Sequence, residues 1–268
     1  MKTKLTVLLL SSIPLHAANL PHGSVELLSK YNSVVRTVPM KLGLHFLLEP
    51  GWHVYWKNPG DSGQAPRIRW TSPVGMDAGE IDWPAPDRLT AGPLVDFGYE
   101  GDLLLPISFG VPAGTLTEKP LVLRGEVRAL ICREVCIPGR AQVSLSVPVR
   151  DGAPAANPEV AALFSGAESR LPVKMPSSWR LSAAQSGDQI LLKVSGTSVP
   201  AGAMFFPGSA GQVEYAAPQR SEQRGADFRL ALVRPRDAKG PLATLDGILR
   251  LPQDSSPAAY LVRTEVSQ

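Results

Sequence analysis

Apolar and polar side chains alternate along several short stretches of this chain, and the alternation indicates β-structure. In residues 121–132 the apolar positions are mostly odd, and the even positions include arginine and glutamate. Because successive side chains of a strand point to opposite faces, this period of two predicts a strand with one buried face. The same pattern recurs at residues 40–48 and 141–147. Shorter extended runs bounded by Pro and Gly are expected at 52–56, 67–70, 81–83 and 103–109.

These segments predict the fold class of the first half. About seven short strands at this spacing favour an antiparallel β-sandwich. The chain has 26 prolines and 24 glycines, which supply turns without reaching the level typical of disordered chains, and 44% hydrophobic residues supply a core. Pro106 interrupts the run at 103–109, and this predicts an edge strand because proline cannot donate a ladder hydrogen bond.

The second half begins after a cluster of Gly, Pro and Ala at residues 151–156, where we expect a domain boundary. Residues 151–172 are interpreted as linker and helix. Asn157 is the expected N-cap, and the apolar face is formed by Leu163, Phe164, Ala167 and Leu171. Residues 173–268 are expected to form a second β-rich domain, which contains no Cys and no His. Its expected strands are 190–194, 203–206, 213–217, 228–233, 244–251 and 260–266.

The amino-terminal residues 1–18 predict a secretory signal peptide. Lys2 and Lys4 precede an apolar run over residues 5–15, which is too short to span a bilayer because spanning takes about 20 residues. No later segment is expected to cross a membrane. The net charge is +3, of which two charges lie in the signal peptide, so nucleic-acid binding is not expected. The predicted destination is an oxidising compartment, which permits disulfides.

The two cysteines, Cys132 and Cys136, have the spacing C-x3-C. In a straight strand their Cα atoms would be about 13 Å apart, whereas a disulfide needs roughly 4.4–6.8 Å. The pair can therefore close only if residues 133–135 form a tight turn. Arg133 would stabilise a thiolate at Cys132, and Glu134 would oppose it. No cofactor is expected, because no phosphate loop, dinucleotide fingerprint or Ser–His–Asp arrangement is present.

Three interpretations of the cysteine pair remain open from the residues alone. A short-loop disulfide restrains little of the unfolded chain, which favours a redox-active pair. A structural disulfide in a secreted binding or adaptor module is the second interpretation. The third is a metal site, with His45 and His53 as the only candidate partners, or copper(I) held by the two thiolates alone.

A resemblance adds to this interpretation. The segments that carry it are 51–58 (Gly-Trp-His-Val-Tyr-Trp-Lys-Asn), Trp83-Pro84, 99–101 (Tyr-Glu-Gly), 104–107 (Leu-Leu-Pro-Ile) and the cysteine pair. Together they resemble the periplasmic amino-terminal domain of the DsbD family of thiol:disulfide interchange proteins, in particular its ScsB-like branch, which is associated with copper tolerance. The resemblance implies an immunoglobulin-like antiparallel β-sandwich. It also implies that Cys132 and Cys136 shuttle between dithiol and disulfide, in a process such as cytochrome c maturation or copper tolerance.

The resemblance also implies supporting residues and partners. His53 and Tyr55 fall where the branch has two tyrosines beside the cysteines. A cap loop that shields the cysteines is expected within residues 88–99, with Phe97 as its aromatic side chain, and Tyr99 is a further candidate. The implied partners are periplasmic thioredoxin-fold proteins. This chain shows neither transmembrane helices nor a C-x-x-C module. We therefore expect either that a separate membrane-embedded thiol reductase supplies electrons, or that the chain is a stand-alone relative with a changed role.

Overall fold

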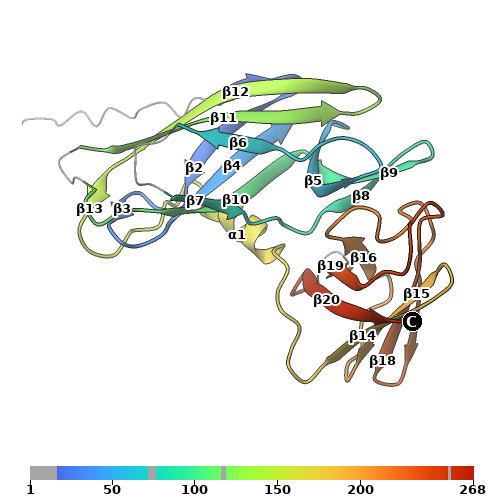
Figure 1. Ribbon diagram of the computed structural model, residues 1–268. Coiled ribbons are helices and arrows are strands. Elements are labelled where there is room, and N and C mark those ends of the chain that lie inside the picture. The colour runs from blue at the N-terminus through green and yellow to red at the C-terminus, as the bar shows by residue number, and fades with distance from the viewer. Residues whose placement is uncertain (1–16, 72–76, 116–118, 253–254) are drawn as a thin grey trace, which may run out of the picture.

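The computed structural model describes residues 17–71, 77–115, 119–252 and 255–268. Residues 1–16 of the predicted signal peptide lie outside these ranges, and Ala18 already begins the first strand. The described chain consists mostly of strands, with one helix, and falls into a β-sandwich followed by a second β domain (Figure 1). The described residues contain no helix that is long and apolar enough to cross a membrane.

Two sheets form the sandwich, which confirms the predicted fold class. The first has the strand order β1-β2-β4-β10-β7, and the second has the order β12-β11-β5-β9-β8, with β6 also paired to β11. The strands of the first sheet are β1 (Ala18–Leu20), β2 (Gly23–Ser29), β4 (Met40–Leu48), β7 (Asp77–Ile81) and β10 (Asp102–Gly110). Those of the second are β5 (His53–Gly60), β6 (Arg67–Trp70), β8 (Asp87–Ala91), β9 (Leu94–Glu100), β11 (Leu121–Cys132) and β12 (Cys136–Val147). The short strands β3 (Val34–Val35) and β13 (Val149–Arg150) pair in parallel.

The core lies between the two sheets, where the alternating strands place their apolar faces. Leu42, Leu44 and Phe46 of β4 are fully buried, as are Leu123, Val127 and Ile131 of β11. Both strands have the bounds that their period of two predicts. Burial of these side chains is the main stabilising contribution to the sandwich, because each removes a large apolar area from water.

Pro106 corrects one expectation, because its strand is not at an edge. β10 pairs with β4 on one side and with β7 on the other. The carbonyl of Pro106 accepts a hydrogen bond from the Asp82 amide at 2.8 Å, so it points toward β7. The ring nitrogen faces the same side, where the register shifts between Ile107 and Phe109. The missing N–H of Pro106 therefore removes no hydrogen bond between β10 and β4.

The helix α1 (Ala161–Ser169) belongs to the packing of the first domain. It begins four residues after the expected N-cap, although the Asn157 side chain accepts a hydrogen bond from the Glu159 amide at 3.2 Å. Phe164 and Ala167 are buried, and they form a cluster with Leu28 and Leu104 of the sandwich. The apolar face predicted for the helix is thus covered by the outside of the first sheet.

The second domain is built on a seven-stranded path with the order β16-β19-β20-β14-β15-β18-β17. Its strands are β14 (Arg180–Ser186), β15 (Gln189–Ser195), β16 (Met204–Pro207), β17 (Arg220–Arg224), β18 (Asp227–Val233), β19 (Thr244–Arg250) and β20 (Ala259–Ser267). The strand expected at 213–217 is absent from this described segment, which forms bends. β17 was not predicted because all five of its residues are exposed and polar, so no alternation marks it.

The two domains share packing. Phe206, Ile248 and Ala259 of the second half are buried in the same cluster as the core of the sandwich. In Figure 1 the second domain, in orange and red, lies against the end of the sandwich that carries β5, β8 and β9. The change of fold along the chain therefore comes after α1 and not at residues 151–156, and the two domains are not independent bodies.

Candidate functional site

The two cysteines form a disulfide at the end of the β11–β12 hairpin. Cys132 and Cys136 are the last paired residues of that ladder, and their Cα atoms are 4.2 Å apart. Residues 133–135 connect the strands, and the Arg133 amide donates to the Val135 carbonyl at 3.2 Å. The C-x3-C spacing predicts this turn, because cysteines four residues apart cannot form a disulfide within a straight strand.

The two halves of the disulfide differ in exposure. Cys132 is 2% exposed, whereas Cys136 and the three residues between the cysteines are exposed. Val135, an apolar side chain at the hairpin tip, is 63% exposed. A partner protein can therefore approach the disulfide from the Cys136 side and contact the hairpin tip at the same time.

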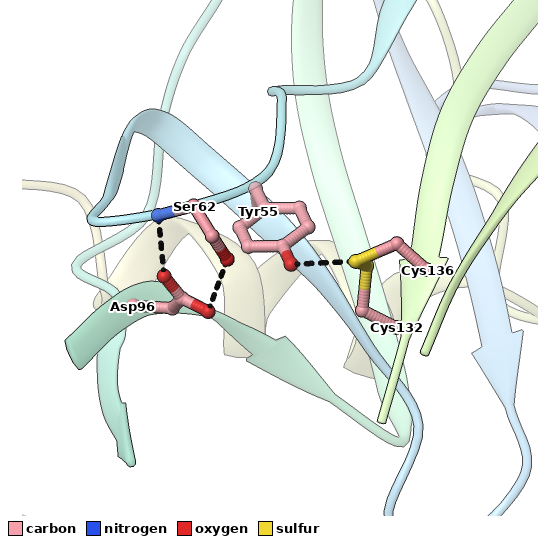
Figure 2. Close-up of a disulfide and its surroundings, with 5 residues drawn as sticks. All are labelled: Tyr55, Ser62, Asp96, Cys132 and Cys136. Atoms are coloured by element: carbon pink, nitrogen blue, oxygen red, sulfur yellow. Dashed lines mark hydrogen bonds between the residues drawn. A yellow bond between two sulfur atoms is a disulfide. The ribbon is translucent and has the colours of Figure 1, made fainter. Parts of the chain in front are cut away.

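Tyr55 covers the disulfide from strand β5. Its hydroxyl lies 3.4 Å from the Cys136 sulfur, as Figure 2 shows, and its side chain is buried. Burial raises the pKa of Tyr55, with a smaller opposing effect from Ser62 and a further raising effect from the Asp96 charge. The hydroxyl therefore keeps its proton at neutral pH and is able to donate it to a sulfur.

A short loop after β5, residues 60–63, covers the ring of Tyr55. A Cβ atom on Gly63 would lie 2.1 Å from the Tyr55 ring, so only glycine fits there. The loop is held by Asp96, whose carboxylate accepts from the Ser62 amide at 2.9 Å and from the Ser62 hydroxyl at 2.8 Å (Figure 2). Ser62, Gly63 and Asp96 were not predicted as site residues. Their sequence context indicates only a turn, and nothing in it shows that the turn packs on Tyr55.

His53 lies beside the buried cysteine. It is the cross-strand partner of Cys132 and packs edge-on against Tyr55, with ring centroids 5.1 Å apart. The side chain is 6% exposed, and its Nε2 atom is buried with no hydrogen-bond partner in the described part of the chain. Burial lowers the pKa of His53, against smaller raising effects of the Asp96 and Glu100 charges. The ring is therefore neutral near pH 7.

Phe97 and Tyr99 lie on the other face of the sheet. Val54 pairs with Tyr99 and Tyr55 pairs with Gly98, so Tyr99 and Phe97 share the face opposite to that of Tyr55. The Tyr99 hydroxyl donates to the Pro84 carbonyl at 2.6 Å. The Phe97 ring contacts Phe206 and Tyr215 of the second domain, at centroid distances of 5.0 and 5.1 Å. The expected cap at 88–99 is thus not a loop over the disulfide, because most of these residues form β8 and β9.

The remaining candidates take different places. Arg133 lies with its guanidinium 5.2 Å from the centre of the Trp52 ring, and Trp52 also stacks on His22. These contacts anchor one side of the hairpin tip, while Glu134 is exposed. His45 lies in the other sheet, where its ring nitrogens contact Glu26 at 2.8 Å and Asp102 at 2.9 Å. His45 lies in a different sheet from His53 and the cysteines, and the described residues contain no group of three or more His, Cys, Asp or Glu side chains that could hold a metal ion.

Comparison with known proteins agrees with this geometry. Residues 25–148 match the family model described as "Thiol:disulfide interchange protein DsbD, N-terminal". The fold is similar to that of the N-terminal periplasmic domain of ScsB from Proteus mirabilis, with a TM-score of 0.61 at 19% sequence identity. That alignment covers 92% of this chain and 94% of the other.

Two other solved structures are much less similar. The YadV chaperone has a TM-score of 0.24 at 10% identity, and the alignment covers 88% of this chain and 98% of the YadV chain. The periplasmic chaperone SfaE has a TM-score of 0.20 at 10% identity, and the alignment covers 90% of this chain and 98% of the SfaE chain. Neither supports an argument about this chain. No curated protein sequence matches the chain.

Proposed function

Residues 25–148 belong to the DsbD N-terminal domain family, and from this premise we propose that the protein exchanges electrons with partner proteins through Cys132 and Cys136. One observation carries the proposal. The cysteines form a disulfide at an exposed hairpin tip, where Cys132 is buried and Cys136 is an exposed residue. A disulfide that closes so short a loop contributes little to stability, so its position is better explained by reactivity.

The proposed exchange proceeds through a mixed disulfide. A partner thiolate attacks the Cys136 sulfur, the bond to Cys132 breaks, and Cys132 leaves as a thiolate that takes up a proton. The partner's second thiol loses its proton and attacks the partner sulfur of the mixed disulfide. Cys136 is released as a thiolate and is protonated in turn. Two electrons and two protons have then passed from the partner dithiol to this protein, and the same steps in reverse reduce a partner.

Tyr55 and His53 are proposed to assist at the two sulfurs. The Tyr55 hydroxyl can donate a hydrogen bond to the Cys136 thiolate from its position at 3.4 Å. The neutral His53 ring, paired with Cys132 in the ladder, can accept the proton of the Cys132 thiol. The two residues therefore act on different cysteines, one exposed and one buried.

The proposed partners are thioredoxin-fold proteins of the periplasm and a separate membrane-embedded thiol reductase. The exposed Val135 offers such a partner an apolar contact beside Cys136. Periplasmic location would follow from cleavage of the predicted signal peptide, residues 1–18.

A trapping experiment tests the proposal. Reduced Cys132→Ser protein, which keeps the exposed Cys136, is mixed with an oxidised thioredoxin-fold protein, and mixed disulfides are counted by non-reducing electrophoresis and mass spectrometry. We expect trapping through Cys136, and much less with Cys136→Ser, which keeps only the buried thiol. Trapping by neither variant would exclude the exchange function.

The reduction potential separates this function from an adaptor module with a structural disulfide. A potential below about −300 mV would mark the bond as structural. We expect a higher value, within the range in which glutathione or thioredoxin buffers equilibrate with the pair.

A further inference from the structure

The second domain contacts the strand that carries Tyr55. Asn58, near the end of β5, is 3% exposed and donates from its side-chain amide to the Pro207 carbonyl at 2.8 Å. The Tyr215 hydroxyl lies 3.4 Å from the same amide nitrogen. A buried amide is costly to leave without partners, so these contacts fix where β5 ends relative to the second domain.

The same side chain also contacts the loop over Tyr55. The Asn58 side-chain oxygen accepts from the Gly60 amide at 3.4 Å, at the first residue of the 60–63 loop. The Asp61 amide then donates to the Val95 carbonyl at 3.0 Å, and Gly63 lies on the Tyr55 ring. A continuous series of contacts therefore runs from Pro207 through Asn58 and the 60–63 loop to Tyr55 and Cys136.

Aromatic packing supports both strands of the site from behind. Phe206 contacts Trp56 of β5 edge-on at 6.5 Å and Phe97 of β9 at 5.0 Å. These contacts lie on the sheet face opposite to the disulfide. β5 carries Tyr55 and β9 carries Asp96, so the second domain holds the two strands that position the loop and its anchor.

We propose that Asn58 is a positioning residue through which the second domain holds the 60–63 loop closed over Tyr55 and so limits access to Cys136 from the β5 side. This gives the second domain, which has no cysteine or histidine, a part in the thiol site. The consequence for electron exchange rests on the function proposed above, whereas the closure of the loop does not.

Asn58→Ala in the full chain tests the proposal with two readouts. The first is deuterium uptake by the amides of residues 60–63, measured by mass spectrometry. The second is the rate at which iodoacetamide alkylates Cys136 in a Cys132→Ser background. We expect faster deuterium uptake at residues 60–63. We also expect the alkylation rate of Cys136 to rise by about fivefold or more, because fivefold is the lower end of typical coupling between two sites. Arg250→Gln is the matched control, because Arg250 pairs with Asp87 at 2.6 Å across the same junction without touching the loop.

The outcomes are distinguishable. If Asn58→Ala leaves both rates at their original values, or if Arg250→Gln raises them equally, the positioning role of Asn58 is wrong. If Asn58→Ala does not fold, Tyr215→Phe replaces it, since this change removes one hydroxyl and keeps the ring on Phe97. Tyr215→Phe must raise both rates by a smaller factor than Asn58→Ala. If it raises neither rate, the proposal is overturned. Loss of partner trapping together with the expected loop behaviour would refute the exchange function alone.

Discussion

Cys132 and His53 are direct cross-strand partners where β11 meets β5, so their side chains lie on one face of the sheet. Nε2 of His53 is buried there and lacks a hydrogen-bond partner within the described residues while the disulfide is closed. Reduction would create a thiol at Cys132 that can donate to this nitrogen. We therefore expect the redox state of Cys132 to change the hydrogen bonding of this buried ring.

Replacing His53 should make the pair harder to reduce. His53→Phe keeps an aromatic ring against Tyr55 but removes the acceptor that the reduced form would use. A hydrogen bond contributes about 1 kcal/mol, and 30 mV corresponds to about 1.4 kcal/mol for a two-electron couple. We therefore expect the potential to fall by about 20 mV in glutathione equilibration. His45→Gln, in the other sheet, should leave it unchanged, and an equal shift there would contradict the assignment.

His53 should also give stability a dependence on pH. Its pKa in the folded protein is lowered from 6.5 by burial, so the unfolded chain binds the proton more readily. The resulting contribution to stability is complete above pH 6.5 and is lost as the pH falls from there toward the folded pKa. The melting temperature of the oxidised protein should therefore decrease between neutral and mildly acidic pH. This decrease should be smaller for His53→Phe than for the wild type. Parallel curves would show that His53 does not titrate as inferred.

Tyr55→Phe should weaken the thiolate at Cys136. The variant keeps the ring under Gly63 but removes the hydroxyl at 3.4 Å from the sulfur. Loss of about 1 kcal/mol would raise the thiol pKa by about 0.7 units, since one unit corresponds to 1.36 kcal/mol. The pH dependence of alkylation in a Cys132→Ser background measures this. Tyr99→Phe is the control, because the Tyr99 hydroxyl bonds to Pro84 on the opposite face. A comparable rise in both variants would show a general effect on folding.

The fold should tolerate loss of the disulfide. In the chain-entropy description a loop this short yields at most about 2 kcal/mol. The double variant Cys132→Ser, Cys136→Ser is expected to remain folded, with a small decrease in denaturant midpoint relative to the oxidised protein. A decrease equivalent to more than about 4 kcal/mol would favour the structural-disulfide alternative.

The helix should be needed by the first domain. Phe164 is 1% exposed against Leu28 and Leu104, so a fragment of residues 19–150 would expose that apolar surface. We expect 19–172 to be better folded than 19–150, and to expose the Phe97 face that the second domain covers. Light scattering and binding of a hydrophobic dye measure both effects. Equal behaviour of the two fragments would place the helix outside the first domain.

Local patterns were sufficient for the strands that alternate clearly and for the turn that closure of the cysteine pair requires. The bounds of β4 and β11 follow from alternation within each segment, because each successive side chain reverses its face. The turn at residues 133–135 follows from the distance that a disulfide spans. The same local reasoning does not mark β17, whose residues are all exposed, or the break at 213–217.

The surroundings of the disulfide required the tertiary structure. Phe97 faces the second domain because of the register between β5 and β9, and a change of one residue in that register would turn it toward the cysteines. Asn58 bonds to Pro207 across 149 positions of the chain, and Gly63 packs on Tyr55 only because Asp96 holds the loop. By itself the sequence determined the alternating strands of the sandwich and the turn that the cysteine pair needs in order to close, since both depend on neighbouring residues. The tertiary structure decided which side chains cover those sulfurs, because that depends on contacts between distant segments.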